Sequence, residues 1–229
     1  MRLFGKLTNF SILVLANNKI KSFPPNVENL VSLTILDLSF NNITLLPSDK
    51  SNLTNLIKLR LDSNKIQMLS NFIIDLSNLE RLELQENKIS EIEEKISFLT
   101  KLKYLNLSNN RITDFSNSIC HLKELKYLSL NNNNIQSLPN SIQNLSNLEI
   151  LELQNNNLKT IPNEIGELKM LSSINLLGNN LGDIPKTLFR ISKLRTIYLD
   201  KDDLKLITES DSQFIKEKGI RLIFKNTYS

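Results

Sequence analysis

The chain has 229 residues, of which 40% are hydrophobic and 23% are charged, so it is long enough for one or two folded domains and is no disordered polyelectrolyte. A single Cys and a single His exclude a disulfide framework, a multi-thiolate metal site and most histidine-based catalytic sites. The net charge of +4 is a small excess of 28 cations over 24 anions, and no basic stripe is interleaved with aromatic residues, so nucleic-acid binding is not expected.

Leucine and asparagine dominate the composition, with 44 and 32 residues, a third of the chain between them. Their spacing is regular, because one pattern returns every 23 residues from Phe10 to Ile207, in nine registers without insertion or deletion. With Phe10 as repeat position 1, position 6 is Leu in every register, and position 9 is Asn in eight registers and Asp202 in the last. Such a period is typical of a solenoid.

Each register predicts one short strand, because repeat positions 4 and 6 are apolar while positions 3, 5 and 7 are mostly polar. Successive strands should pair in parallel, about 4.8 Å apart. No single repeat can bury its apolar face alone, so stacking should create one continuous core. The expected strands lie at 12–16, 35–39, 58–62, 81–85, 104–108, 127–131, 150–154, 173–177 and 196–200.

The rest of each register should cross back to the start of the next strand. Proline at position 15, as in Pro139, Pro162 and Pro185, starts a stiff outer segment, although Ser70, Glu93 and Ser116 stand there in three repeats. Because the crossover is wider than a strand, the stack should curve with its strands on the concave side. We expect the Asn at position 9 to cap backbone groups, with Asp202 making the last repeat irregular.

The two ends of the repeat array differ. We expect nine repeats over 1–208 and a C-terminal cap over 209–229, in which Ser210 to Gln213 form a capping box, Gly219 ends the helix, and Ile220 and Leu222 occupy positions 4 and 6 of a last strand. Leu3, Phe4 and Leu7 resemble a partial preceding repeat without an N-terminal cap. Missing upstream repeats, a homodimer or another partner would each cover that end.

The pattern L-x-x-L-x-L-x-x-N, followed by Leu138-Pro139, Ile161-Pro162 and Ile184-Pro185, resembles the 23-residue variant of the leucine-rich repeat across essentially the whole chain. This variant occurs in Ras-group scaffold proteins and in secreted or surface proteins of pathogenic spirochaetes. The resemblance implies an α/β solenoid, a right-handed curved horseshoe with a parallel β-sheet on its concave face.

The resemblance also implies a non-enzymatic module that binds a protein partner through the concave face. Three settings remain open: a secreted or cell-surface protein of a bacterium, a cytoplasmic scaffold of the Ras-group type, and the recognition domain of a larger enzyme. No cofactor or metal is expected. Because no run of about 18 apolar residues exists, no membrane span is expected either. The adjacent Cys120 and His121 lie on the outer crossover without a third partner, so we do not assign them catalysis.

The outward strand positions are where binding residues are expected. Three of the four tyrosines, Tyr104, Tyr127 and Tyr198, lie there, and tyrosine is enriched at binding hot spots. The other interpretations are cross-strand packing of the rings and mutual neutralisation of the charges beside them. The candidate contact residues are Tyr104, Tyr127, Tyr198, Lys58, Arg60, Arg81 and Glu83.

The first two repeats carry apolar residues at outward positions. These are Ile12, Val14, Ile35 and Phe40, next to the expected uncapped end. Because an apolar patch on a wet face usually marks an interface, we expect contact with a second copy or another chain there.

Overall fold

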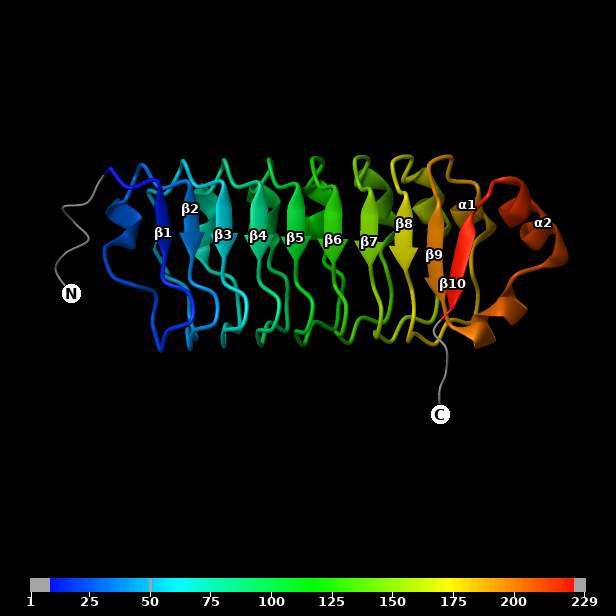
Figure 1. The fold of residues 1–229 in the computed structure, drawn as a ribbon, viewed down its shortest axis with the longest axis horizontal. Helices are drawn as coiled ribbons and strands as arrows, with labels where there is room; N and C mark the ends of the chain where they lie inside the picture. The colour runs from blue at the N-terminus through cyan, green and yellow to red at the C-terminus, as the bar shows by residue number, and fades with distance from the viewer. Residues whose placement is uncertain (1–8, 50, 225–229) are drawn as a thin grey trace.

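A computed structural model of the chain describes residues 9–49 and 51–224, and in this range ten parallel strands lie side by side in sequence order, backed by the crossovers (Figure 1). The strands are β1 (Ile12–Val14), β2 (Ile35–Asp37), β3 (Lys58–Arg60), β4 (Arg81–Glu83), β5 (Tyr104–Asn106), β6 (Tyr127–Ser129), β7 (Ile150–Glu152), β8 (Ser173–Asn175), β9 (Thr196–Leu199) and β10 (Arg221–Phe224). This confirms the α/β solenoid with its parallel sheet.

The strand register follows the 23-residue period. Leu105 of β5 pairs with Leu82 of β4 and Leu128 of β6, so equal repeat positions face each other across the sheet. The same offset holds from β1 to β9. Because no residue is inserted, side chains at one repeat position form continuous rows perpendicular to the strands.

Short helices form the outer crossovers, most of them of the 3₁₀ type. They are η2 (Val27–Asn29), η3 (Asn71–Asp75), η4 (Glu94–Phe98), η5 (Asn117–His121), η6 (Asn140–Asn144), η7 (Asn163–Glu167), α1 (Lys186–Phe189), η8 (Lys201–Leu206) and α2 (Glu209–Glu217). Pro139, Pro162 and Pro185 occupy the N-cap positions of η6, η7 and α1. Where proline is absent, the hydroxyls of Ser70 and Ser116 cap η3 and η5 by accepting bonds from backbone N–H groups.

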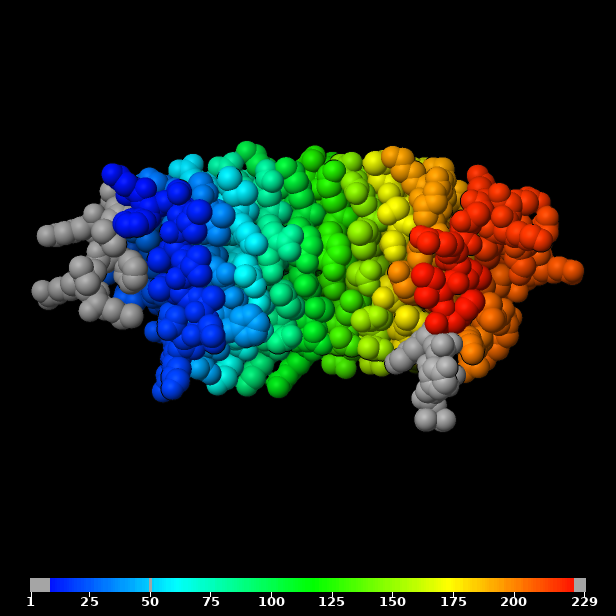
Figure 2. Space-filling model, viewed as in Figure 1, coloured from blue at the N-terminus to red at the C-terminus, as the bar shows by residue number. Residues whose placement is uncertain are grey.

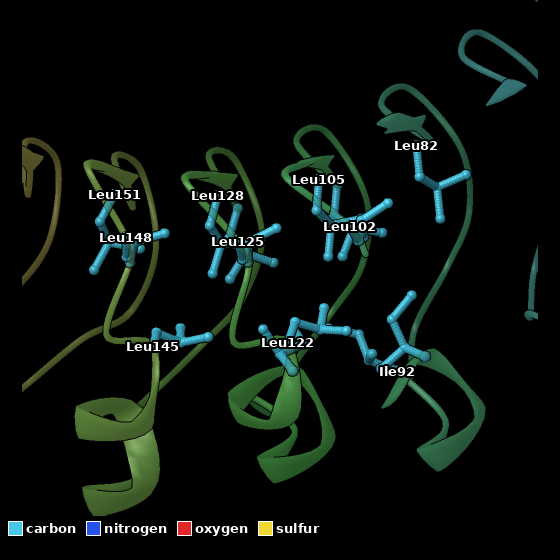
Figure 3. Close-up of a cluster of buried hydrophobic side chains, with 14 of the residues drawn as sticks. Leu82, Ile92, Leu102, Leu105, Leu122, Leu125, Leu128, Leu145, Leu148 and Leu151 are labelled. Carbon is cyan, nitrogen blue, oxygen red and sulfur yellow. The ribbon is translucent and has the colours of Figure 1, made fainter. Parts of the chain in front are cut away.

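The core consists of leucine and isoleucine rows that run the length of the solenoid. Figure 3 shows one such row, Leu105, Leu128 and Leu151, beside a second row from position 1 of the repeat. These side chains are fully buried. Each repeat thus buries its apolar face against its two neighbours, which is why the stack and not the single repeat is stable.

The asparagine at repeat position 9 serves the backbone, as expected. The amide nitrogen of Asn110 donates to the carbonyl oxygens of Leu84, Leu107 and Ser108 at 3.0–3.2 Å, and its amide oxygen accepts from the N–H of Ile89 at 3.0 Å. The same four bonds recur at Asn41, Asn64, Asn87, Asn133, Asn156 and Asn179. The last repeat is irregular, because Asp202 lies inside η8.

The C-terminal end differs from the prediction in two details. The capping box is formed by Thr208 and Asp211, not by Ser210, because Thr208 falls at repeat position 15, where η3 to η7 and α1 also have their N-caps. The longer helix α2 adds two residues, so Leu222 and not Ile220 pairs with Ile197 at position 4. Gly219 ends the helix with φ +66°, as expected.

At the other end, the first described repeat is less buried than those that follow. Leu13, Leu15 and Ile20 are only partly buried, whereas the same positions in the next repeat are fully buried. Leu3, Phe4 and Leu7, which were expected to form a partial repeat, lie outside the described residues.

Candidate binding face

The strand side of the solenoid presents the outward side chains as one continuous surface from β1 to β10 (Figure 2). Repeat positions 3, 5 and 7 alternate with the buried leucines, so their side chains leave the sheet on the concave side. Residues at position 3 are more exposed than most at positions 5 and 7, because Asp37, Asp62, Glu83 and Ser129 are buried. The face therefore has a floor of short or acidic side chains and a row of larger ones above it.

At its centre, three planar groups stack on neighbouring strands. The rings of Tyr104 and Tyr127 lie parallel, with centroids 4.3 Å apart and an interplanar angle of 3°. The guanidinium carbon of Arg81 lies 3.5 Å from the centroid of the Tyr104 ring. Since β4, β5 and β6 are consecutive in the sheet, Arg81 and Tyr127 lie on opposite sides of Tyr104. Both tyrosine side chains remain half-exposed.

Beside the stack, three cations and three carboxylates form what we call the charge cluster, composed of Lys58, Arg60, Arg81, Asp37, Asp62 and Glu83. Glu83 lies 2.6 Å from Nε of Arg81, 3.4 Å from Nε of Arg60 and 3.5 Å from Nζ of Lys58. Arg60 also reaches Asp37 at 2.9 Å and Asp62 at 3.3 Å. The cluster has no formal net charge. This agrees with the alternative interpretation that these side chains neutralise one another.

The two best-buried carboxylates of the cluster have opposite pKa shifts. Burial alone would raise the pKa of Glu83, but the hydrogen bond from Arg81 and the charges of Arg81, Arg60 and Lys58 outweigh it and lower that pKa. Burial raises the pKa of Asp62, and the charge of Arg60 only partly offsets it. Glu83 is thus the anion around which the cations are arranged.

The remaining sequence-predicted contact residues are spread along the face. Tyr198 lies on β9, three strands from Tyr127, and does not join the stack. Between them, the amide of Asn175 donates to Glu152 and Gln154, both at 2.9 Å. The sequence-predicted site residues did not include Asp37 and Asp62. The signal for Asp37 was the alternation of sign at repeat position 5, from Asp37 to Arg60 and Glu83, and the signal for Asp62 was its place at position 7, two residues after Arg60 on the same face.

The apolar residues of the first two repeats are exposed on the same face. Ile12, Val14 and Phe40 have exposed fractions of 53%, 61% and 54%, while Ile35 is half-buried. Phe40 lies in the turn after β2 with φ +52°, in the left-handed region that disfavours bulky side chains. At the same repeat position Asn17, Asn109 and others fill this conformation.

Outside the concave face, the described residues offer little that could carry chemistry. Cys120 is buried, and burial raises the pKa of its thiol, which opposes formation of the reactive thiolate. No group of three potential metal ligands occurs in residues 9–49 and 51–224. In that same range, none of the helices has the length and hydrophobicity that a membrane crossing requires.

Comparison with protein families confirms the resemblance seen in the repeats. A family profile described as leucine rich repeat matches residues 54–112, 77–135, 100–158 and 123–181, more than half of the chain, and a second such profile matches 32–53. The chain belongs to the leucine-rich-repeat family. A comparison with curated proteins found no significant match.

Solved structures of the family are similar over most of this leucine-rich-repeat chain. A leucine-rich-repeat protein of the spirochaete Leptospira interrogans is 34% identical, with a TM-score of 0.87 over 95% of this chain and 55% of that one. The ectodomain of the Arabidopsis thaliana receptor kinase GASSHO1/SCHENGEN3, in complex with Casparian strip integrity factor 2, is 29% identical, with a TM-score of 0.76 over 86% of this chain.

A further similar structure is the plant peptide hormone receptor RGFR1 in complex with RGF2, which is 27% identical, with a TM-score of 0.68 over 86% of this chain. This chain spans about half the length of the Leptospira protein. It covers 25% of the first receptor and 37% of the second. The fold is therefore one on which related proteins bind protein or peptide partners.

Proposed function

We propose that this chain is a non-enzymatic binding module that holds a protein or peptide partner on its concave face, centred on Tyr104 and Tyr127. The observation that carries this proposal is the half-exposed stack of Arg81, Tyr104 and Tyr127. Tyrosine and arginine dominate binding hot spots, because they offer a large contact area and a polar tip. The stacked side chains are already ordered, so binding costs little further entropy.

The surroundings of the stack support the same function. Lys58 and Arg60 lie beside it as partly exposed cations, and the carboxylate of Glu83 beneath them pairs with both and with Arg81 of the stack. The related plant receptors are in complex with partners in their solved structures, which agrees with a binding role for the fold.

The test is the double substitution Tyr104→Ala and Tyr127→Ala. Partner binding should weaken by about 2 kcal/mol or more, roughly 30-fold, while the chain stays folded by circular dichroism. A pull-down with the wild type and the variant side by side finds the partner, and a titration then measures its affinity. The matched control is Phe98→Ala, which removes an exposed aromatic side chain from the outer face. Unchanged affinity in the double variant would place the binding site elsewhere.

We place the module at the surface of a bacterium or in its secreted fraction. This setting is favoured by the similarity to the Leptospira protein. Antibody labelling of intact and of permeabilised source cells separates it from a cytoplasmic scaffold. Labelling only after permeabilisation would favour the Ras-group type of scaffold, and a catalytic domain in the same gene would favour the recognition domain of an enzyme.

A further inference from the structure

In the charge cluster, the cationic side chains are more exposed than the carboxylates with which they pair. The side chains of Lys58, Arg60 and Arg81 are 34%, 30% and 39% exposed. Those of their carboxylate partners Asp37, Asp62 and Glu83 are only 10%, 4% and 9% exposed. The cluster is neutral in sum, yet the layer that an approaching partner meets consists of N–H donors. An anionic group above it gains three nearby cations and is shielded from the carboxylates below.

The most exposed of these cations is also held in place. Nε of Arg81 donates to Glu83 at 2.6 Å, and the guanidinium carbon lies over the Tyr104 ring, 3.5 Å from its centroid. Its terminal amino groups make no hydrogen bond to any residue in 9–49 or 51–224. A fixed guanidinium whose two terminal amino groups are free offers one edge with two N–H donors, which matches the two oxygens of a carboxylate. Lys58, which pairs with Arg81 in the strand register, supplies a second donor at the same height.

We infer that this part of the concave face binds an acidic side chain of an extended protein segment, with an apolar side chain two residues before it and another two residues after it. The inference rests on the proposed function and specifies the partner of the same site. The carboxylate would lie between Lys58 and Arg81. One apolar side chain would lie over Ile35 and the other beside the Tyr104 ring.

The spacing follows from the geometry of the row at repeat position 3, which runs Ile35, Lys58, Arg81 and Tyr104 on four consecutive strands. Adjacent strands are about 4.8 Å apart, so the midpoint between Lys58 and Arg81 is about 7 Å from Ile35 and equally far from Tyr104. In an extended segment, every second side chain lies on one face, about 7 Å from the next. A segment that runs along the solenoid axis therefore brings three alternate side chains over these three places.

The flanks of the cluster favour a single acidic side chain over a polyanion. On one side lie the exposed apolar residues Ile12 and Val14 of β1, and on the other lie the uncharged strands β5 and β6, followed by the carboxylate of Glu152 on β7. A nucleic acid binds through many phosphate contacts along a basic track, and here the three cations of the cluster lie on only two adjacent strands, β3 and β4.

The experiment is selection of a displayed library of random nine-residue peptides on the wild-type chain. Selected peptides should carry Asp or Glu with apolar residues two positions to either side. They should bind at least ten-fold more weakly to the double variant Lys58→Gln and Arg81→Gln. The matched control is Lys103→Gln with Lys126→Gln, which removes two exposed cations from repeat position 2, beside the row at position 3, and should leave affinity unchanged. If the double variant does not fold, Arg81→Lys keeps a charge beside Glu83 but loses the bidentate contact with the partner's carboxylate, and should bind several-fold more weakly.

Three outcomes would overturn the inference. The inference would be wrong if the selected peptides lacked an acidic residue. It would also be wrong if they carried one but bound the double variant Lys58→Gln and Arg81→Gln as tightly as the wild type. Such peptides would leave the proposed function intact if Tyr104→Ala with Tyr127→Ala still abolishes their binding. A library that yields no binder removes both proposals for peptide partners. Tighter binding of a labelled single-stranded oligonucleotide than of the selected peptides, lost in the Lys58 and Arg81 variant, would replace the acidic segment by a nucleic acid.

Discussion

Tyr104 and Tyr127 form a parallel ring stack whose geometry is set by the sheet. The two residues pair directly in the register of β5 and β6, and their ring centroids lie 4.3 Å apart. Parallel strands are about 4.8 Å apart, so equal side chains at equal repeat positions meet face to face. The same pairing places Arg81 on the free face of Tyr104. Packing and binding are therefore compatible roles for these rings.

The stack should contribute measurably to stability. Tyr104→Ala and Tyr127→Ala should each destabilise the chain, and a double-mutant cycle should give a coupling of about 1 kcal/mol, because offset and stacked aromatic pairs gain this much beyond burial. Urea unfolding of the wild type, both single variants and the double variant measures it. A coupling near zero would mean that the rings touch without stabilising each other.

Tyr127 should make the fold sensitive to alkaline pH. Burial, and after it the neighbouring Tyr104, raise the pKa of Tyr127 to about 12 from an ordinary value of 10.0. The folded chain therefore holds the phenol proton more tightly than the unfolded chain. The resulting stability is present below about pH 10 and is lost as the pH rises through about 12.

Comparison of the wild type with Tyr127→Phe isolates this effect, because the other titrating groups are common to both. The free energy of unfolding should fall more steeply from about pH 10 to about pH 12 in the wild type than in the variant. Parallel curves in urea titrations over this range would contradict the raised pKa.

The asparagine row should be the most sensitive polar feature of the scaffold. Asn110→Ala leaves three backbone carbonyls and one N–H without their side-chain partner in a buried place, so a loss of about 2–3 kcal/mol is expected. Asn18→Ala is the control at the exposed end, where the amide donates, among the residues that the structure describes, to the carbonyls of Leu15 and Ala16 alone, and should cost less than about 1 kcal/mol. If urea unfolding gave the same loss of unfolding free energy for Asn110→Ala and Asn18→Ala, the additional bonds of the buried asparagine would not contribute to stability.

Glu83 and Asp62 should respond differently to neutralisation. The pKa of Glu83 is lowered below its ordinary value of 4.5, so its contribution is present above that pH and is lost as the pH falls through the lower folded pKa. Glu83→Gln should cost about 1–2 kcal/mol at neutral pH and less at about pH 3. The pKa of Asp62 is raised by burial, which means that ionised Asp62 is disfavoured in the fold.

Asp62→Asn is accordingly the matched control in the same cluster and should change stability by less than about 0.5 kcal/mol at neutral pH. Unfolding of both variants at neutral and acidic pH gives the comparison. A larger loss for Asp62→Asn than for Glu83→Gln would reverse the assignment of Glu83 as the central anion.

Phe40 should make the fold less stable than an asparagine would at the same position. Its positive φ and its exposed ring are both unfavourable, whereas asparagine fills the same conformation at Asn109. Phe40→Asn should therefore raise the free energy of unfolding by about 0.5–1 kcal/mol, as measured by urea unfolding.

If the exposed patch of Ile12, Val14 and Phe40 contacts a second copy, the same variant should weaken self-association in sedimentation over a range of concentrations. If the wild type sediments as a monomer at every concentration, and Phe40→Asn and Ile35→Asp leave its sedimentation unchanged, the homodimer is excluded.

Much of the scaffold was predictable from the sequence because the 23-residue period acts locally in every repeat. It identified the strands, the leucine rows and the bonding role of the asparagines, and it placed Tyr104 beside Tyr127. The prediction from the period was wrong at the C-terminal end, where the spacing between strands changes. The helix α2 begins at Glu209, after its N-cap Thr208, and adds two residues before β10, so the positions predicted for Ile220 and Leu222 were wrong by two.

The depth and direction of the charged side chains were decided only by the tertiary structure. The sequence places Lys58, Arg81 and Glu83 on one face, but it does not tell which of them is buried. That depends largely on ion pairs between neighbouring strands, such as Lys58 with Glu83 and Arg60 with Asp37, which lie one repeat of 23 residues apart along the chain and about 4.8 Å apart in the sheet. The carboxylates are short and stay at the floor, while the longer cations extend above them and Arg81 settles on a tyrosine ring. The sequence by itself determined a repeat scaffold with an outward face, and the packing of neighbouring repeats decided which charges a partner meets on it.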